Sequence, residues 1–173
     1  FSGDVPAPIP LLGDKDAYRF SSVSSYKNAF NESPSSINIS LLTGHSMLRV
    51  QVMNGEINRS ATKDEIIKMQ NILENALIDG SIGLSTGLAY PAANDAPTEE
   101  IIELAKVLKK HDGIFTTHMR NEGDNLVESV NETIKIGKLA DVRTVISHHK
   151  CAGRSNWGKS KETLKLIKEA KKK

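Results

Sequence analysis

A strand–helix–strand pattern within residues 113–153 constrains the fold of this chain more than any other stretch. Two short apolar segments, 114–117 and 143–147, flank a run with helical periodicity, and a histidine follows each segment, His118 and His148. Parallel strands joined by a crossover helix point in the same direction, so their carboxyl ends lie on one edge of the sheet. The pattern therefore predicts that the two imidazoles project from the same edge.

The same alternation of a short apolar segment and an amphipathic helix occurs four times from residue 37 onward. Strands are predicted at 37–42, 82–86, 114–117 and 143–147. This order is typical of an α/β protein with a parallel sheet. An eight-stranded (β/α)8 TIM barrel usually takes about 250 residues, so a chain of 173 residues predicts a partial barrel of about four units. An open doubly wound sheet is the alternative, although no G-x-G-x-x-G fingerprint supports it.

Helix boundaries follow from capping and stop residues. Thr62 and Glu65 have the spacing of a capping box, which predicts a helix that ends at Gly80. The next three helices are predicted to be capped by Thr98, Asn125 and Ser160. Residues 48–53, which precede these helices, are predicted to be extended or part of a loop.

The first 36 residues lack this pattern. Pro6, Pro8 and Pro10 predict an extended, turn-rich opening, and serine clusters follow. A short helix over 16–30 and a flexible linker both remain open. The chain is therefore divided into an N-terminal segment, 1–36, and a β/α-repeat region, 37–173.

Composition excludes several classes of function. The formal net charge of +2 is too small to favour a nucleic-acid partner. No apolar run reaches the roughly 18 residues of a membrane span, and no signal peptide is visible. The single cysteine, Cys151, cannot form an internal disulfide, which fits a reducing, cytoplasmic compartment. Because the chain starts at Phe1, it is expected to be a processed form or part of a longer protein.

His118 and His148 are the first candidates for chemistry. Two neutral imidazoles at adjacent strand ends can share one metal ion, although each could instead be a hydrogen-bonded histidine near a loop. His149 is expected to face a helix, because side chains alternate along a strand. Cys151 follows the histidines, but no C-x-x-C motif is present, so a packing role is expected.

Three further residues at the predicted strand ends could bind a ligand. Arg120 and Lys150 each stand two residues after a candidate histidine, where they could hold a carboxylate or form ordinary surface ion pairs. Tyr90, in a loop flanked by breakers, could line a pocket or the edge of the core. The carboxylates of Glu122 and Asp124 are interpreted as partners of Arg120 or as charges near a helix N-terminus.

Four ordered motifs carry a resemblance to a known family. They are G-L-S-T-G-L-A-Y-P at 83–91, T-H-M-R-N-E-G-D at 117–124, I-S-H-H-K at 146–150 and N-W-G-K at 156–159. In this order they resemble the D-aminoacylases, the N-acyl-D-amino-acid deacylases of the amidohydrolase superfamily. The resemblance extends from about residue 37 to the end and implies the central part of a metal-dependent hydrolase barrel.

The resemblance also implies an activity and roles for residues. Such enzymes cleave N-acyl-D-amino acids to a D-amino acid and a carboxylate, using water activated by zinc. His118 and His148 match the family's zinc ligands. Tyr90, Arg120 and Lys150 would then hold the small-molecule substrate, a hypothesis from their positions. No nucleic-acid or membrane partner is expected.

The chain also lacks parts of the family's pattern. The H-x-H pair of the first barrel strand and a cysteine ligand are absent, and the acid/base aspartate would lie beyond Lys173. No catalytic residue can therefore be named within this chain, which is expected to be inactive or weakly active alone. A related amidohydrolase acting on cyclic amides and a non-catalytic anion-binding half-barrel remain alternatives. Open barrel edges make self-association possible.

Overall fold

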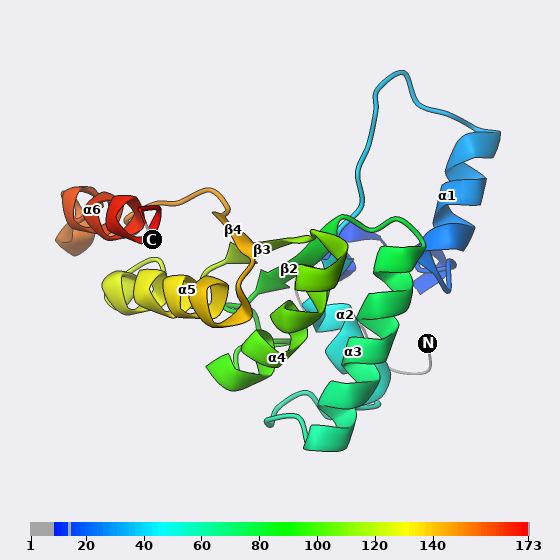
Figure 1. The fold of residues 1–173 in the computed structure, drawn as a ribbon, viewed down its shortest axis with the longest axis horizontal. Coiled ribbons are helices and arrows are strands. Elements are labelled where there is room, and N and C mark those ends of the chain that lie inside the picture. The colour runs from blue at the N-terminus through cyan, green and yellow to red at the C-terminus, as the bar shows by residue number, and fades with distance from the viewer. Residues whose placement is uncertain (1–8, 14, 173) are drawn as a thin grey trace.

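The computed structural model describes residues 9–13 and 15–172, and Figure 1 shows their arrangement. Four parallel strands form one sheet in the order β1-β2-β3-β4. They are β1 (Thr43–Gly44), β2 (Gly83–Gly87), β3 (Ile114–His118) and β4 (Arg143–Ile146). The proline-rich opening predicted around Pro6 and Pro8 lies outside the described residues.

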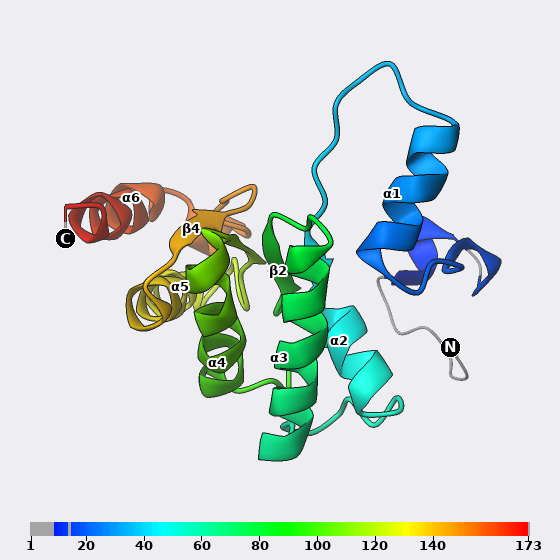
Figure 2. The same cartoon turned by 45° about the vertical axis from the view of Figure 1, so that its right-hand side comes forward.

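Six α-helices are present in the described part of the chain. They are α1 (Val23–Glu32), α2 (His45–Val52), α3 (Lys63–Ile78), α4 (Thr98–Leu108), α5 (Leu126–Ala140) and α6 (Ser160–Ala170). Short 3-10 helices are η1 (Ile9–Leu12), η2 (Lys15–Ala17), η3 (Lys109–His111) and η4 (Arg154–Asn156). Neighbouring helices from α3 to α6 pack on one another along the sheet (Figures 1 and 2). The predicted α/β fold with a parallel sheet, a partial barrel of four β/α units, is confirmed.

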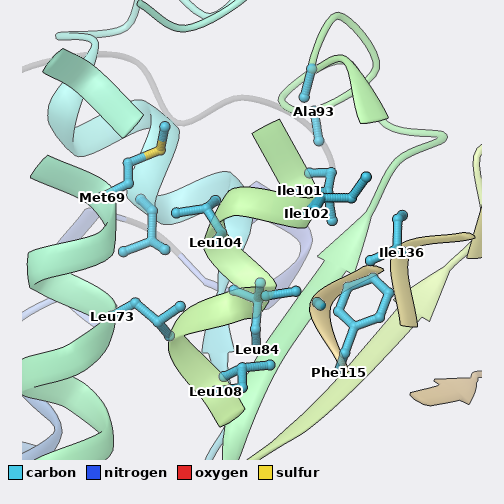
Figure 3. Packing of buried hydrophobic residues seen from close by; sticks show 14 of the residues in the cluster. Met69, Leu73, Leu84, Ala93, Ile101, Ile102, Leu104, Leu108, Phe115 and Ile136 are labelled. Carbon is cyan, nitrogen blue, oxygen red and sulfur yellow. The ribbon is translucent and has the colours of Figure 1, made fainter. Parts of the chain in front are cut away.

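The main core lies between the sheet and helices α3 and α4 (Figure 3). Leu84 of β2 and Phe115 of β3 point into it and are fully buried. Burying one such side chain contributes roughly 1.5–3 kcal/mol relative to leaving it exposed. The inward face of α4 consists of buried residues: Ile101, Leu104, Ala105 and Leu108. This core fixes the positions of the strand ends that carry the candidate site.

The region before β2 differs most from the prediction. Residues 37–42, predicted as a strand, have no regular structure, and β1 is confined to Thr43–Gly44. Residues 48–53, predicted as extended or loop, lie mostly in α2, where Leu48 and Val50 are buried. Ile37 remains 69% exposed, so apolar β-type residues without a buried face and a pairing strand do not form a strand here.

Helix starts are predicted well only where the cap is a side chain that bonds the backbone. The Thr62 capping box is confirmed, and Gly80 follows the end of α3 with a φ of +108°. Thr98 and Ser160 are the first helical residues rather than caps, because Pro97 and Lys159 occupy the cap positions. Asn125 is the cap residue of α5, but its side chain forms no capping hydrogen bond.

The N-terminal helix is shorter than predicted and has no buried residue. It begins after Ser22, whose side chain accepts a hydrogen bond from the Ser25 amide in a capping box. Lys27 donates from Nζ to the Asp79 carbonyl over 2.6 Å, which ties α1 to the end of α3. Figure 2 shows α1 standing away from the sheet. In the described part of the chain, no helix has the length and apolarity to cross a membrane.

Candidate metal centre

The carboxyl-end rim of the sheet brings His118 and His148 together. His118 is the last residue of β3, and His148 comes two residues after β4. Nδ1 of His118 lies 3.0 Å from Nε2 of His148, and the ring centroids are 4.6 Å apart. The parallel direction of the two strands places both imidazoles on one edge, as the sequence predicted.

The backbone at His148 adopts an uncommon conformation. Ser147 still donates to the Thr117 carbonyl over 2.9 Å, so pairing with β3 continues one residue past β4. His148 then has a φ of +40°, in the left-handed region. This region costs a non-glycine residue about 1–2 kcal/mol, and such strain is concentrated at functional sites.

Glu122 is the residue that sequence reasoning missed. Its side chain is only 8% exposed, and its two carboxylate oxygens face the two histidines. Oε1 lies 3.3 Å from Nδ1 of His148, and Oε2 lies 3.6 Å from Nε2 of His118. The prediction that Glu122 pairs with Arg120 is wrong, since Arg120 pairs with Glu132. The available signal was a carboxylate four residues after His118, at the same strand end.

These three residues suit a metal ion. One ligand atom from each of His118, Glu122 and His148 lies within 4.8 Å of the others. Two imidazoles and a carboxylate form a set that zinc accepts in catalytic sites, with a position left for water. Oε1 of Glu122 is buried and has no hydrogen-bond partner, and a cation would satisfy it. The residues present therefore fit the metal that the fold family implies.

Electrostatics at the rim favour a neutral His118. Burial lowers the pKa of His118 below its ordinary value, and Glu122 opposes this effect, while His148 and Lys150 add to it. A neutral ring keeps the lone pair that a metal ligand needs. Lys150 forms an ion pair with Oε2 of Glu122, and its Nζ lies 2.9 Å from Nδ1 of His148. The predicted substrate residue Lys150 is therefore part of the same cluster.

Tyr90 reaches the rim from the loop between β2 and α4. Its ring centroid lies 4.9 Å from that of His118, at an angle of 37°. Gly87 permits this approach, because a Cβ atom at this position would lie 2.6 Å from Cδ2 of Tyr90. The structure thus brings two of the three predicted substrate residues, Tyr90 and Lys150, beside the histidines.

Arg120 is turned toward other partners. Its guanidinium contacts both carboxylate oxygens of Glu132 on α5. It also donates to the carbonyl oxygens of Asn94 and Ala96, over 2.7 and 3.0 Å. These contacts lie along the loop between β2 and α4, and a role for Arg120 in substrate binding stays a prediction.

The neighbouring His149 and Cys151 have the packing roles expected of them. Nε2 of His149 lies 2.8 Å from Oγ1 of Thr163 on α6, so its ring faces a helix. Cys151 is a half-buried free thiol that packs against a small core beneath the rim, formed around Met119 and Leu126. Neither residue belongs to the histidine–carboxylate group.

Comparison with known proteins finds relatives of this chain. No protein-family model matches the chain. A D-aminoacylase from Alcaligenes xylosoxydans xylosoxydans is 46% identical over 165 residues, which cover 95% of this chain and 34% of the relative. An N-acyl-D-aspartate deacylase from the same organism is 42% identical over 167 residues, covering 96% of this chain and 33% of the relative.

Solved structures give the same result. A crystal structure of D-aminoacylase, described as defining a novel subset of amidohydrolases, matches with a TM-score of 0.93 and 47% identity over 96% of this chain and 35% of that chain. N-acyl-D-glutamate deacylase from Bordetella bronchiseptica, complexed with zinc and a phosphonate inhibitor, matches with a TM-score of 0.94 and 36% identity, covering 99% of this chain and 36% of that chain.

The half-barrel has an amidohydrolase-type fold, and the histidine–carboxylate cluster lies at its rim. Within that class, the resemblance to the D-aminoacylase family is confirmed by sequence and by structure. The chain spans about a third of the length of the relatives that it matches. A further matching structure concerns the binuclear metal center in D-aminoacylase, so metal binding is a property of these neighbours.

Proposed function

We propose that this chain is part of a zinc-dependent hydrolase that cleaves N-acyl-D-amino acids to a D-amino acid and a carboxylate. The observation that carries the proposal is the convergence of His118, Glu122 and His148, with one ligand atom of each within 4.8 Å of the others. The relatives support the substrate class, because they are named as a D-aminoacylase and deacylases of N-acyl-D-aspartate and N-acyl-D-glutamate.

In this proposal His118 and His148 hold the zinc ion, and Glu122 is the third protein ligand. A bound zinc ion would polarise the scissile amide carbonyl and lower the pKa of a water molecule. Burial lowers the pKa of His118, which favours metal binding because it keeps the ring in the neutral form. The side chain of Glu122 is largely buried, which shields its charge from water and strengthens its attraction for a cation.

The substrate contacts are proposed from position. Lys150 is half-exposed at the rim, and its ammonium group can attract the carboxylate of the amino acid. Tyr90 packs against His118 and can border the acyl group on the side of β2. Arg120 remains the third predicted substrate residue, although its present partners are Glu132 and two carbonyl groups. We further propose that the chain alone is inactive or weakly active.

A zinc titration by calorimetry tests the metal centre directly. The chain is expected to bind zinc, and His118→Ala and His148→Ala are each expected to weaken binding by at least about tenfold, because each removes a ligand. His149→Ala is the matched control, since this neighbouring ring bonds Thr163 instead. Micromolar binding that survives the loss of His118 would contradict the assignment.

The choice of substrate is tested separately. Any turnover is expected on N-acetyl-D-amino acids, and none on dihydropyrimidines or hydantoins, the cyclic amides of the alternative amidohydrolase. Activity confined to the cyclic compounds would reject the proposal. Because the chain alone is proposed to be inactive or weakly active, the anion-binding half-barrel would be supported only if a longer form that contains this chain bound zinc and anions but turned over neither class.

Three further expectations remain predictions. A cytoplasmic location and the absence of nucleic-acid partners rest on composition alone. Self-association is expected through the outer strands β1 and β4, because they form the two edges of the sheet. Val145 on β4 is 47% exposed. Sedimentation at several protein concentrations measures this association, and a constant monomer mass would exclude it.

A further inference from the structure

We propose that Arg120 and Glu132 form a clamp that positions Tyr90 against His118 by fixing the loop between β2 and α4, residues 88–97. Arg120 and Glu132 are thus positioning residues that act through this loop. The relevance of the clamp to catalysis rests on the proposed function, whereas the clamp itself is a property of this chain and can be tested without metal or substrate.

The guanidinium of Arg120 bridges two elements. Toward α5, its Nε and Nη2 donate to Oε2 and Oε1 of Glu132 over 3.0 and 2.8 Å. Toward the loop, Nη1 and Nη2 donate to the carbonyl oxygens of Asn94 and Ala96. A bidentate pair of this kind fixes the plane of the guanidinium, which a lysine could not reproduce.

Burial makes these contacts firm. The side chain of Glu132 is 13% exposed and that of Arg120 is 29% exposed, so both charges are largely shielded from water. Glu132 also accepts a hydrogen bond from Oγ1 of Thr98 over 2.8 Å, and Thr98 is the first residue of α4. The carboxylate therefore holds the carboxyl end of the loop twice, through Arg120 and through Thr98.

The other end of the loop is fixed to β3. The Leu88 amide donates to the His118 carbonyl over 3.1 Å, and the Tyr90 backbone amide donates to the Gly87 carbonyl in a turn. The amides of Ala93 and Asn94 both donate to the Tyr90 carbonyl over 2.9 Å. The clamped carbonyl of Asn94 is thus connected to Tyr90 through the hydrogen bonds of the same loop segment.

The clamp is proposed to maintain the contact between the rings of Tyr90 and His118. Their ring centroids are 4.9 Å apart, and Gly87 leaves the space that the Tyr90 ring occupies. A loop released at Asn94 and Ala96 would lose the bonds that hold it beside α5, and Tyr90 would be free to leave His118. Arg120 thus affects the site indirectly, by holding the loop that carries Tyr90, while its own charge is paired with Glu132.

The experiment compares Arg120→Gln, Glu132→Gln and the double variant in the whole chain. Hydrogen exchange of the loop amides and the NMR ring-proton signals of His118 are measured without metal. Each single variant is expected to raise exchange at Ala93 and Asn94 by about tenfold. The His118 signals are expected to shift toward those of Tyr90→Leu, and the double variant is expected to add little to either single variant.

Lys135→Gln is the matched control. It removes an ion pair between α5 and α4, Lys135 with Glu99 at 3.1 Å, that does not touch the loop. Loop exchange and the His118 signals are expected to stay as in the unaltered chain. Unchanged loop exchange and unchanged His118 signals in Glu132→Gln would overturn the proposal. So would additive effects in the double variant, which would mean that the two residues act independently.

Discussion

Two clusters of histidine, glutamate and a basic side chain differ in their access to solvent, because one is enclosed in the core and the other lies at the open rim of the sheet. The closed cluster consists of His45, Arg49 and Glu100, whose side chains are fully buried. The open cluster consists of the rim residues His118, Glu122, His148 and Lys150, with exposed fractions from 8% to 51%. The same chemical groups therefore occur in two very different surroundings.

The carboxylate of the closed cluster is saturated with internal hydrogen bonds, whereas Nδ1 of His45 and Nε of Arg49 are buried without a hydrogen-bond partner. Nη1 of Arg49 lies 2.6 Å from both carboxylate oxygens of Glu100, and its Nη2 donates to the Ile57 carbonyl. Burial alone would raise the pKa of Glu100, but hydrogen bonds from His45 and Arg49 outweigh this effect and lower it. The cluster joins α2, α4 and the segment after α2, and it leaves no carboxylate oxygen for a ligand.

The carboxylate of the open cluster is not fully hydrogen-bonded within the chain. It has a lysine where the closed cluster has an arginine, and Oε1 of Glu122 is buried without a hydrogen-bond partner. A cluster open to solvent, with a carboxylate oxygen that no hydrogen bond satisfies, can accept a metal, whereas the enclosed and fully bonded carboxylate of Glu100 cannot. The difference teaches that access to solvent and a carboxylate oxygen without a hydrogen bond, and not residue types, separate the candidate site from a structural network.

Removal of the buried cation gives the largest expected effect. Arg49→Met leaves Glu100 charged in the interior without its permanent cation, so the free energy of unfolding is expected to fall by about 3–5 kcal/mol in urea denaturation. Lys150→Met makes the same chemical change in the open cluster, where about half of the lysine side chain is exposed, and is expected to cost less than about 1 kcal/mol. Equal losses in the two variants would remove the distinction between the clusters.

Replacement of each carboxylate by an amide tests the comparison through the acidic residues of the two clusters. Glu122→Gln is expected to weaken zinc binding by about 10–100-fold in calorimetry while changing stability little, because it removes the negative charge nearest the histidines. Glu100→Gln is expected to lower stability and leave zinc affinity unchanged. If Glu100→Gln weakened zinc binding as much as Glu122→Gln, the assignment of the metal site to the rim would be wrong.

The pH dependence of stability includes a contribution from His45 of the closed cluster. Burial lowers the pKa of His45 below its ordinary value of 6.5, so below this pH the unfolded chain binds a proton that the folded chain does not. Stability is therefore expected to fall as pH drops below about 6.5, with a slope of at most about 1.4 kcal/mol per pH unit from this group.

A His45→Gln variant isolates this contribution. It keeps a donor for Glu100 but has no group that titrates in this range, so its curve of stability against pH is expected to be flatter between pH 7 and 5 than that of the unaltered chain. The measurement is a series of urea titrations. Parallel curves for the two proteins would show that His45 does not carry the effect.

Local patterns were enough to predict the frame of the site. The period of the apolar residues placed His118 and His148 at the ends of two parallel strands, and His149 toward a helix. The capping box at Thr62 marked the start of α3. These features depend on side-chain alternation and backbone hydrogen bonding within a few residues, which is why the sequence alone reveals them.

Features that depend on burial could not be predicted in the same way. The apolar residues at 37–42 suggested a strand, yet no neighbour buries them, while residues 48–53 contribute to a helix because Leu48 and Val50 find a core to enter. The apolar residues of α5 differ in the same way, because Val130 is buried while Val127 and Ile134 are only partly buried. Packing against the rest of the molecule decided these cases.

The sequence by itself determined the α/β order, the parallel sheet and the shared edge of the two histidines. Only the tertiary structure decided which charges meet: Glu122 with His148 and Lys150, Arg120 with Glu132, and His45 with Glu100 across 55 positions. The reason is physical. Strand direction and helix period are written in neighbouring residues, whereas the pairing of charges depends on which loops and helices the folded core brings together.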